Sequence, residues 1–287
     1  MQAILFALLT YLGWGTGDIF GTIAARKIGA ASTTIWAFCL GIFLFSFYIP
    51  FTWNEIYRFT PLLLFITGII GILIIVGNVS YNEALRIGNP SLVGTICASF
   101  TSLVVIFSVI FYKESLSSAE VVSICAIFFG VLLCTFHIED IKKKNFRFDK
   151  SILLSFLTMF CWAIAFTLLK IPANKVGWFW PNYLTFLFFP IIFFYIKIKK
   201  IHFYMPTRKN ALLPLIITTI LLRGGDFAYN FAITKGYAAV VAPIAGAYAT
   251  LLSILAFFVF RQPLHKQQIT GIVITLVGIV ALSFLSA

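Results

Sequence analysis

Ten runs of mostly apolar residues follow one another along this chain, and their length limits the folds open to it. Each run holds about 20 residues, which is what an α-helix needs to cross the hydrocarbon core of a bilayer. The runs cover residues 3–25, 32–51, 61–86, 90–112, 117–137, 150–171, 178–197, 211–235, 238–260 and 266–286. Most connections are short, so neighbouring helices run antiparallel and no soluble domain fits between them. The runs predict an all-α integral membrane protein with ten transmembrane helices.

Composition agrees with a lipid environment. Hydrophobic residues make up 61% of the 287 residues and charged residues 10%, whereas a soluble domain carries about 25% charged residues. The net charge of +12 comes from 21 basic and 9 acidic residues, and most of the basic ones lie between the apolar runs. In loops they set topology and contact lipid headgroups. We therefore expect membrane lipids, and no nucleic acid, as partners.

The two halves of the chain match each other at a constant offset of 148 residues. Matching residues include Trp14 and Trp162, Gly77 and Gly225, Tyr81-Asn82 and Tyr229-Asn230, and Gly130 and Gly278. These pairs predict two repeats of five helices, residues 1–140 and 149–287. Because five is odd, the second repeat enters the membrane from the opposite side. Inverted repeats of this kind are typical of secondary transporters, although duplication within a structural protein is the alternative.

Three ionisable residues lie deep within predicted spans: Asp18 in the first, and Arg223 and Asp226 in the eighth. A charge at the middle of the bilayer costs at least about 2.5–3.5 kcal/mol, so such residues face the interior of the bundle and indicate function. Spacings of four, three, four and four residues place a polar stripe on one face of the eighth span, formed by Thr219, Arg223, Asp226, Asn230 and Thr234. The matching stripe in the third span is weaker and holds Gly71, Ile75, Asn78, Asn82 and Arg86. We expect an asymmetric cavity whose charge comes mostly from the second repeat.

Arg223 and Asp226 are three residues apart, and two interpretations of them stay open. They could pair only to make insertion into the membrane tolerable. Alternatively, Arg223 binds an anionic substrate group such as a carboxylate, while Asp226 or Asp18 senses a proton or a cationic group. Proton or counter-substrate coupling is a possible consequence of the second interpretation.

Aromatic residues accompany the carboxylate of the first span. Tyr11, Trp14 and Asp18 share one helical face, and an aromatic ring near a buried carboxylate can recognise a cation or stack on a planar substrate. Ordinary packing is the alternative for these rings and for Tyr81 and Tyr229. The predicted binding or coupling residues are Tyr11, Trp14, Asp18, Asn78, Tyr81, Asn82, Arg223, Asp226, Tyr229 and Asn230.

Small residues in the fourth and ninth spans predict close contacts between helices. Gly94 and Ala98 recur in the second repeat as Ala242 and Gly246, at the spacing that lets two backbones approach each other. Pro243 lies beside them and is expected to kink the ninth span. No histidine pair has the spacing of a zinc site, and no nucleophile elbow or phosphate-binding loop is present. We therefore expect no metal, no cofactor and no enzymatic activity.

With these residues identified, the chain resembles the drug/metabolite transporter superfamily and its EamA-type branch over nearly its whole length. The resemblance is carried by Trp14-Gly15, the Tyr81/Ala84 region, Tyr112-Lys113-Glu114, and Gly130 and Gly278. It implies a basket of helices 1–4 and 6–9 around a central cavity, with helices 5 and 10 peripheral. It also implies export or exchange of amino acids, nucleobases, other metabolites or drugs. The chain departs from the family pattern at Gln262, where Glu is usual, and at Ala163, where Gly usually follows the tryptophan.

The predicted function is thus secondary transport of a small polar metabolite by alternating access, in a cell inner or plasma membrane, by a monomer or homodimer. A non-transporting scaffold or receptor of the same fold is the alternative. Two indications of the orientation of the chain in the membrane disagree. Basic clusters such as Lys142-Lys143-Lys144 lie in loops opposite the N-terminus, so the positive-inside rule places both termini outside. The family resemblance places them in the cytoplasm.

Overall fold

The computed structural model describes residues 1–135, 150–207, 211–261 and 265–286, and every regular element within these ranges is a helix. The first half contains α1 (Gln2–Ile28), α2 (Ala30–Ser46), α3 (Ile49–Thr52), the 3₁₀ helix η1 (Trp53–Arg58), α4 (Pro61–Ile87), α5 (Pro90–Ala98), α6 (Phe100–Tyr112) and α7 (Ser118–Thr135). The second half contains α9 (Lys150–Val176), α10 (Phe179–Phe186), α11 (Ile191–Lys199), α12 (Leu212–Lys235), α13 (Ala238–Gly246), α14 (Tyr248–Phe260) and α15 (Lys266–Leu285).

The described helices account for each of the ten predicted spans. Eight are long and apolar enough to cross a membrane, with α5–α6, α10–α11 and α13–α14 each forming one of them. The second predicted span bends by 66° between α2 and the segment Ile49–Arg58. The fifth corresponds to the shorter apolar helix Ser118–Leu133 within α7. The predicted all-α multi-pass membrane fold is therefore confirmed.

The repeat is visible in the helix boundaries themselves. α1 and α9, α5 and α13, and α6 and α14 each begin and end at residues 148 positions apart. Backbone exceptions repeat as well: Lys113 and Arg261 both have φ of 54°, and Gly29 and Gly177 both have positive φ. Left-handed residues end a helix and turn the chain sharply. The two halves therefore share these two turns, whereas Lys200, with φ of 52°, has no left-handed counterpart at Thr52.

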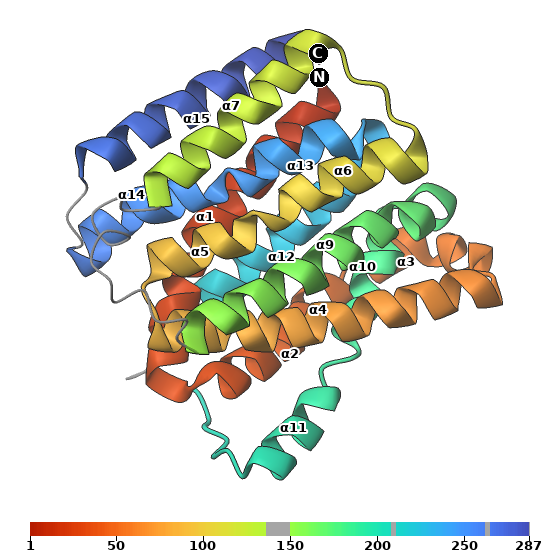
Figure 1. Cartoon of the computed structure of the whole chain (residues 1–287). Helices are drawn as coiled ribbons and strands as arrows, with labels where there is room; N and C mark the ends of the chain where they lie inside the picture. Colours follow the sequence, from red (N-terminus) through yellow and green to blue (C-terminus); the bar gives the residue numbers. More distant parts are fainter. Residues whose placement is uncertain (136–149, 208–210, 262–264, 287) are drawn as a thin grey trace.

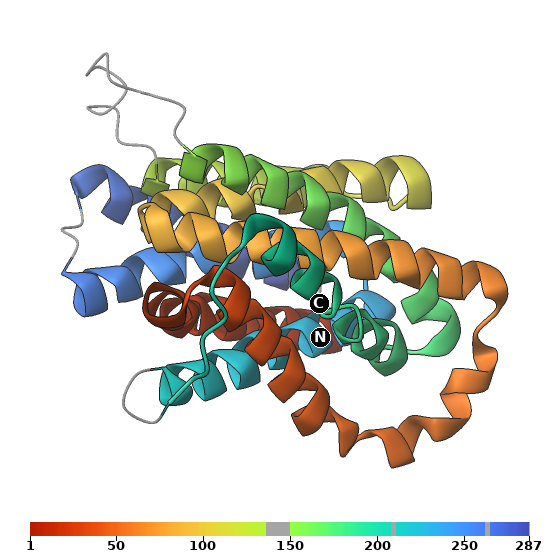
Figure 2. The ribbon, with the colours of Figure 1, turned by 90° about the horizontal axis from the view of Figure 1, so that it is seen from below.

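The halves pack as an inverted pair. α1 lies along α12, and the repeat equivalents of these helices, α9 and α4, lie along each other in the same way. α1 and α9 run in opposite directions in both views (Figures 1 and 2). α7 packs against α15 at the periphery, as the family resemblance implies (Figure 1). Both termini lie at one end of the bundle, here called the terminal end.

The repeats differ at one matched pair of spans. In the first repeat, α2 is a continuous helix of 17 residues before its bend. In the second, the matching α10 ends after 8 residues, and α11 begins after a break at residues 187–190. α11 projects from the rest of the bundle (Figure 1). These two matched spans therefore have different conformations.

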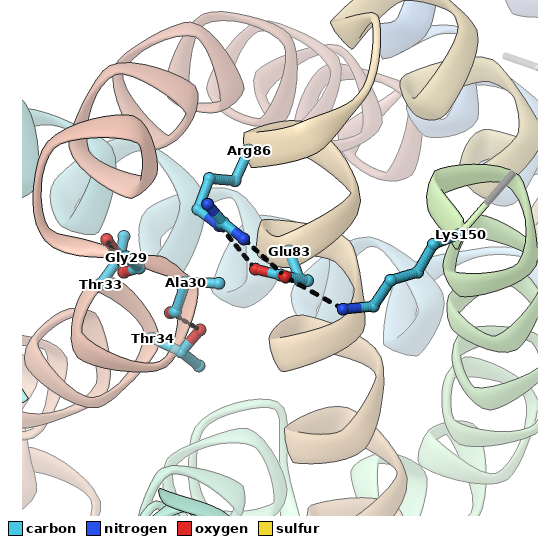
Figure 3. A network of polar contacts seen from close by, with 7 residues as sticks. All are labelled: Gly29, Ala30, Thr33, Thr34, Glu83, Arg86 and Lys150. Carbon is cyan, nitrogen blue, oxygen red and sulfur yellow. Dashed lines mark hydrogen bonds and ion pairs between the residues drawn. The ribbon is translucent and has the colours of Figure 1, made fainter. Parts of the chain in front are cut away.

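Opposite the terminal end, an ion-pair network joins the two repeats where α4 ends and α9 begins (Figure 3). Glu83 accepts hydrogen bonds from Arg86 Nε at 2.7 Å and Nη2 at 2.8 Å, and Lys150 Nζ lies 3.5 Å from the same carboxylate. Thr33 and Thr34 lie near the start of α2 beside it, and their hydroxyls donate to the carbonyls of Gly29 and Ala30. Arg86 and Lys150 are exposed, so screening leaves this network little stabilising effect.

The predicted packing residues lie in close helix contacts. Ala98 and Ala242 are buried, Gly94 lies against Leu252, and a Cβ at Gly246 would collide with the side chain of Thr101. Pro243 lies inside α13, but it does not explain the break at Ala247. The matching break in the first repeat, at Ser99, has a threonine in the proline's place. The span that contains Pro243 and its equivalent in the first repeat are therefore both interrupted, although only one of them has the proline.

Because Gly246 has no room for a Cβ, we expect Gly246→Ala to lower the stability of the bundle by about 1–3 kcal/mol through overpacking. Gly224→Ala is the matched control, since no atom lies within 4 Å of a Cβ built there. Thermal unfolding in detergent, monitored by size-exclusion chromatography, should show a lower midpoint temperature than the parent for Gly246→Ala and not for Gly224→Ala. Equal midpoints for the two variants would contradict the close contact.

Candidate functional site

A cavity of about 590 Å³, including the part open to solvent, lies between the two repeats. It is lined by Trp14, Asp18, Ile70, Ile74, Asn78, Tyr81, Phe100, Trp162, Phe166, Leu169, Asn182, Thr185, Leu222, Arg223, Asp226 and Tyr248. Both halves contribute, through α1, α4 and α6 from the first and α9, α10, α12 and α14 from the second.

Arg223 holds the two repeats together at this cavity. The side chain is only 4% exposed. Its Nη1 lies 2.8 Å from Asp226 Oδ2 on the same helix, and its Nη2 donates to Asn78 Oδ1 on α4 at 3.2 Å. The guanidinium also lies over the rings of Phe38 and Phe186, at 4.7 and 5.6 Å from their centroids. A buried arginine with a paired carboxylate and two aromatic faces is well compensated for lost water.

Asp226 is held on both oxygens. Oδ2 faces Arg223, and Oδ1 accepts a hydrogen bond from Trp14 Nε1 at 2.9 Å. The carboxylate therefore connects α1 of the first repeat to α12 of the second. Charge-assisted hydrogen bonds to a buried carboxylate are among the stronger ones in proteins. This triad fixes the orientation of Arg223 toward Asn78.

Asp18 forms a separate polar centre in the same cavity. It is 3% exposed, and its Oδ2 accepts a hydrogen bond from Tyr81 Oη at 2.5 Å. Among the described residues, no basic side chain is within ion-pair distance of Asp18. The two carboxylates of the cavity thus differ, because Asp226 has a cationic partner and Asp18 has a phenol.

The structure brings six of the ten predicted binding residues to the cavity: Trp14, Asp18, Asn78, Tyr81, Arg223 and Asp226. The other four contact neighbouring helices and do not line it. Tyr11 Oη lies 3.4 Å from Thr250 Oγ1, Asn82 donates to Thr34 Oγ1, and Asn230 donates to the carbonyl of Trp178. Tyr229 stacks on Trp14, with ring centroids 5.5 Å apart. For all ten residues, a role in binding stays a prediction.

The repeat explains the asymmetry of the cavity. Tyr229 matches Tyr81, but Phe166 stands where Asp18 would be, so the Tyr229 hydroxyl is buried without a hydrogen-bond partner among the described residues. Ile75 stands where Arg223 would be. Trp162 matches Trp14, yet its Nε1 has no acceptor there, whereas Trp14 donates to Asp226. Asn78, which matches Asp226, accepts from Arg223 instead. Each half therefore contributes a different part of one polar site.

Sequence reasoning missed Asn182 and Thr185 of α10, which line the cavity. Two polar residues three positions apart in an aromatic span were the available signal. Glu114, which follows the fourth predicted span, is 6% exposed, forms an ion pair with Lys170, and accepts hydrogen bonds from the N–H groups of Ala238 and Ala239. The carboxylate thus caps α13, where a helix N-terminus favours negative charge.

The Glu114 contact lies at the terminal end, where an aromatic cluster also joins the repeats. Phe179 stacks on Phe227 with centroids 5.2 Å apart, and Tyr48 contacts both Trp178 and Phe179. Trp180 Nε1 donates to the carbonyl of Thr52 at 2.7 Å. α10 is therefore fastened to α2, α3 and α12 on the terminal side of Asn182 and Thr185.

Because Asp226 is the partner of a buried guanidinium, Asp226→Leu should destabilise the protein by about 3–5 kcal/mol by leaving that charge unpaired. The double variant Arg223→Met/Asp226→Leu removes both charges and should recover most of this loss. Thermal unfolding of the two variants and of the parent in the same detergent checks this. A double variant less stable than Asp226→Leu would show that the pair is not the main interaction of Arg223.

Among the described residues, no group of three or more histidine, cysteine, aspartate or glutamate side chains is placed to hold a metal ion. Gln262 and the cluster Lys142-Lys143-Lys144 lie outside the described residues.

Comparison with known proteins agrees with this architecture. The model of the EamA-like transporter family matches residues 1–136 and again residues 149–284. A search of curated protein sequences finds no significant match. A solved structure titled only "Crystal structure of protein" superposes with a TM-score of 0.73 at 15% sequence identity, and the alignment covers 99% of this chain and 97% of that one. This likeness shows the fold alone. Two family matches that together span nearly all of the sequence, on a duplicated bundle of apolar helices, show that the chain belongs to the EamA-like transporter family.

Proposed function

We propose that this EamA-family membrane protein is a secondary transporter that moves a small polar metabolite by alternating access around the cavity between its repeats. The observation that carries the proposal is the placing of Asp18, Arg223 and Asp226 together in a cavity lined by both halves. Ionic groups at the middle of the bilayer are costly and mark substrate or ion pathways. A scaffold has no need for such a cavity, and among the described residues no set of catalytic groups converges as an enzyme requires.

The different conformations of the matched spans support alternating access. The terminal end is fastened by the Glu114–Lys170 ion pair and by the aromatic cluster around Phe179. At the opposite end, α11 projects from the bundle, and the Glu83–Lys150 contact is exposed. The present conformation therefore favours access from the face opposite the termini. Exchange of the two conformations between the repeats gives access from the other face.

The first test concerns Arg223. Arg223→Lys keeps a positive charge opposite Asp226, so the fold is retained, but a lysine cannot reproduce the fork that also reaches Asn78. We expect uptake of a labelled metabolite into liposomes to fall by about tenfold or more. A panel of amino acids and nucleobases, with and without a pH gradient, identifies the substrate and any proton coupling. Glu83→Gln, which changes a carboxylate outside the cavity, is the control, and normal uptake by Arg223→Lys would contradict the site.

The second test concerns access. In a variant without Cys39, Cys97, Cys125, Cys134 and Cys161, Thr185→Cys places one thiol at the cavity. A membrane-impermeant maleimide should label it from the face opposite the termini, and transported substrate should change the rate. Equal labelling from both faces would indicate a channel, and no labelling from either face would indicate a dry interior. Both results contradict the proposal.

A further inference from the structure

The charges of the cavity do not balance when Asp18 is ionised. The carboxylate and guanidinium side chains of its lining are Asp18, Arg223 and Asp226, and the last two neutralise each other across 2.8 Å. The Asp18 carboxylate accepts a hydrogen bond from Tyr81 and has no ion-pair partner among the described residues. In a site largely removed from water, such a carboxyl group is ionised at least cost when a positively charged ligand compensates its charge, so the site favours a cation. A ligand with a net negative charge meets two carboxylates and one arginine that is already paired.

The cavity also holds hydrogen-bond donors without acceptors. Arg223 Nε and Asn182 Nδ2 are buried and have no hydrogen-bond partner in the described part of the chain. Both belong to side chains that line the cavity and are less than a tenth exposed. A buried N–H without an acceptor costs about 1–3 kcal/mol, so a ligand that brings an acceptor is favoured. Two N–H donors without acceptors, one on α10 and one on α12, therefore belong to side chains that line the cavity.

The acceptor that suits these donors is uncharged. A carboxylate placed against Arg223 would also lie near Asp226, which already occupies Nη1 of the same guanidinium. Like charges repel strongly where water is scarce. A carbonyl or carboxamide oxygen accepts the same two hydrogen bonds without this repulsion.

The body of the ligand meets aromatic walls. Trp14, Phe100, Trp162, Phe166 and Tyr248 line the cavity around the two polar centres. Trp14 lies edge-on to Tyr248 and to Phe166, with centroids 5.8 and 5.4 Å away. Such walls accept a flat apolar body and add cation–π attraction for an ammonium group.

We infer that the preferred ligand of this cavity is a monocationic amine that carries an uncharged hydrogen-bond acceptor on a flat apolar body, with its ammonium group at Asp18 and its acceptor at Arg223 Nε and Asn182 Nδ2. The inference rests on the transporter function proposed above and specifies its substrate class. It makes Asn182 a specificity-determining residue. It also means that Arg223 contacts an uncharged group of the ligand.

Four probes with one skeleton test this inference. 4-(2-Aminoethyl)benzamide carries both groups, phenethylamine lacks the acceptor, 4-ethylbenzamide lacks the amine, and 4-(2-aminoethyl)benzoate has a carboxylate in place of the amide. Isothermal titration calorimetry on the full chain in nanodiscs measures their affinities, and empty nanodiscs correct for partition into lipid. The first probe should bind at least about tenfold more tightly than each of the others.

Two variants connect each ligand group to its residue. Asp18→Asn should weaken binding of 4-(2-aminoethyl)benzamide by about tenfold or more and leave 4-ethylbenzamide unchanged. Asn182→Leu should weaken binding of 4-(2-aminoethyl)benzamide and leave the affinity for phenethylamine unchanged. Glu83→Gln is the control for loss of a carboxylate, and size-exclusion chromatography confirms folding. If Asp18→Asn does not fold, Tyr81→Phe replaces it, because that variant removes the hydrogen bond that Tyr81 donates to the Asp18 carboxylate.

The outcomes separate this inference from the transporter proposal, because binding is measured without transport. Equal or tighter binding of the benzoate, or equal binding of phenethylamine, would overturn the assigned acceptor. Affinity that is unchanged in the folded Asp18→Asn or Tyr81→Phe protein would overturn the ammonium site. No binding by the whole series would overturn the ligand class, while uptake in the liposome panel would leave the transporter function standing.

Discussion

The ion pair between Arg223 and Asp226 is the interaction on which the interior of this protein depends. Hydrocarbon rejects an isolated guanidinium, so Arg223 can lie at the middle of the bundle only with its charge compensated. The compensation comes from several helices: Asp226 on α12, Trp14 on α1 through Asp226, and Asn78 on α4. Phe38 and Phe186 cover the faces of the guanidinium. One buried charge thereby fixes the positions of helices from both repeats.

Duplication supplied the framework, and divergence between the copies made the site. The same tryptophans and tyrosines occur in both halves, at Trp14 and Trp162 and at Tyr81 and Tyr229. Within these pairs, Tyr81 has a carboxylate beside it and Trp14 has an acceptor. Their equivalents, the Tyr229 hydroxyl and Trp162 Nε1, have no hydrogen-bond partner in the described part of the chain, so the second copy of each contact is missing. A symmetric framework thus carries an asymmetric site.

Most of the architecture could be predicted because few backbone structures are stable in the bilayer. Spans of about 20 apolar residues have one stable form in lipid, and an odd number of spans per repeat forces inversion. The polar stripe of α12 and the position of Asp18 were likewise readable, since ionic groups in such spans must face inward. Asn182 and Thr185 could not be found in this way, because polar uncharged residues are tolerated in many orientations. Glu114 could not either, because its partners, Lys170 and the start of α13, lie far away in the sequence.

The sequence by itself determined the membrane fold, the duplication and its inversion, and which ionic residues had to avoid lipid. These properties follow from hydrophobicity, length and internal matching, which are local or periodic. The tertiary structure decided how the inward-facing groups pair: Arg223 with Asp226, Trp14 with Asp226, and Tyr81 with Asp18. It also decided that Tyr11, Asn82, Tyr229 and Asn230 contact helices outside the cavity lining. Pairing depends on distances between helices and on rotations about their axes, and no one-dimensional pattern contains those quantities.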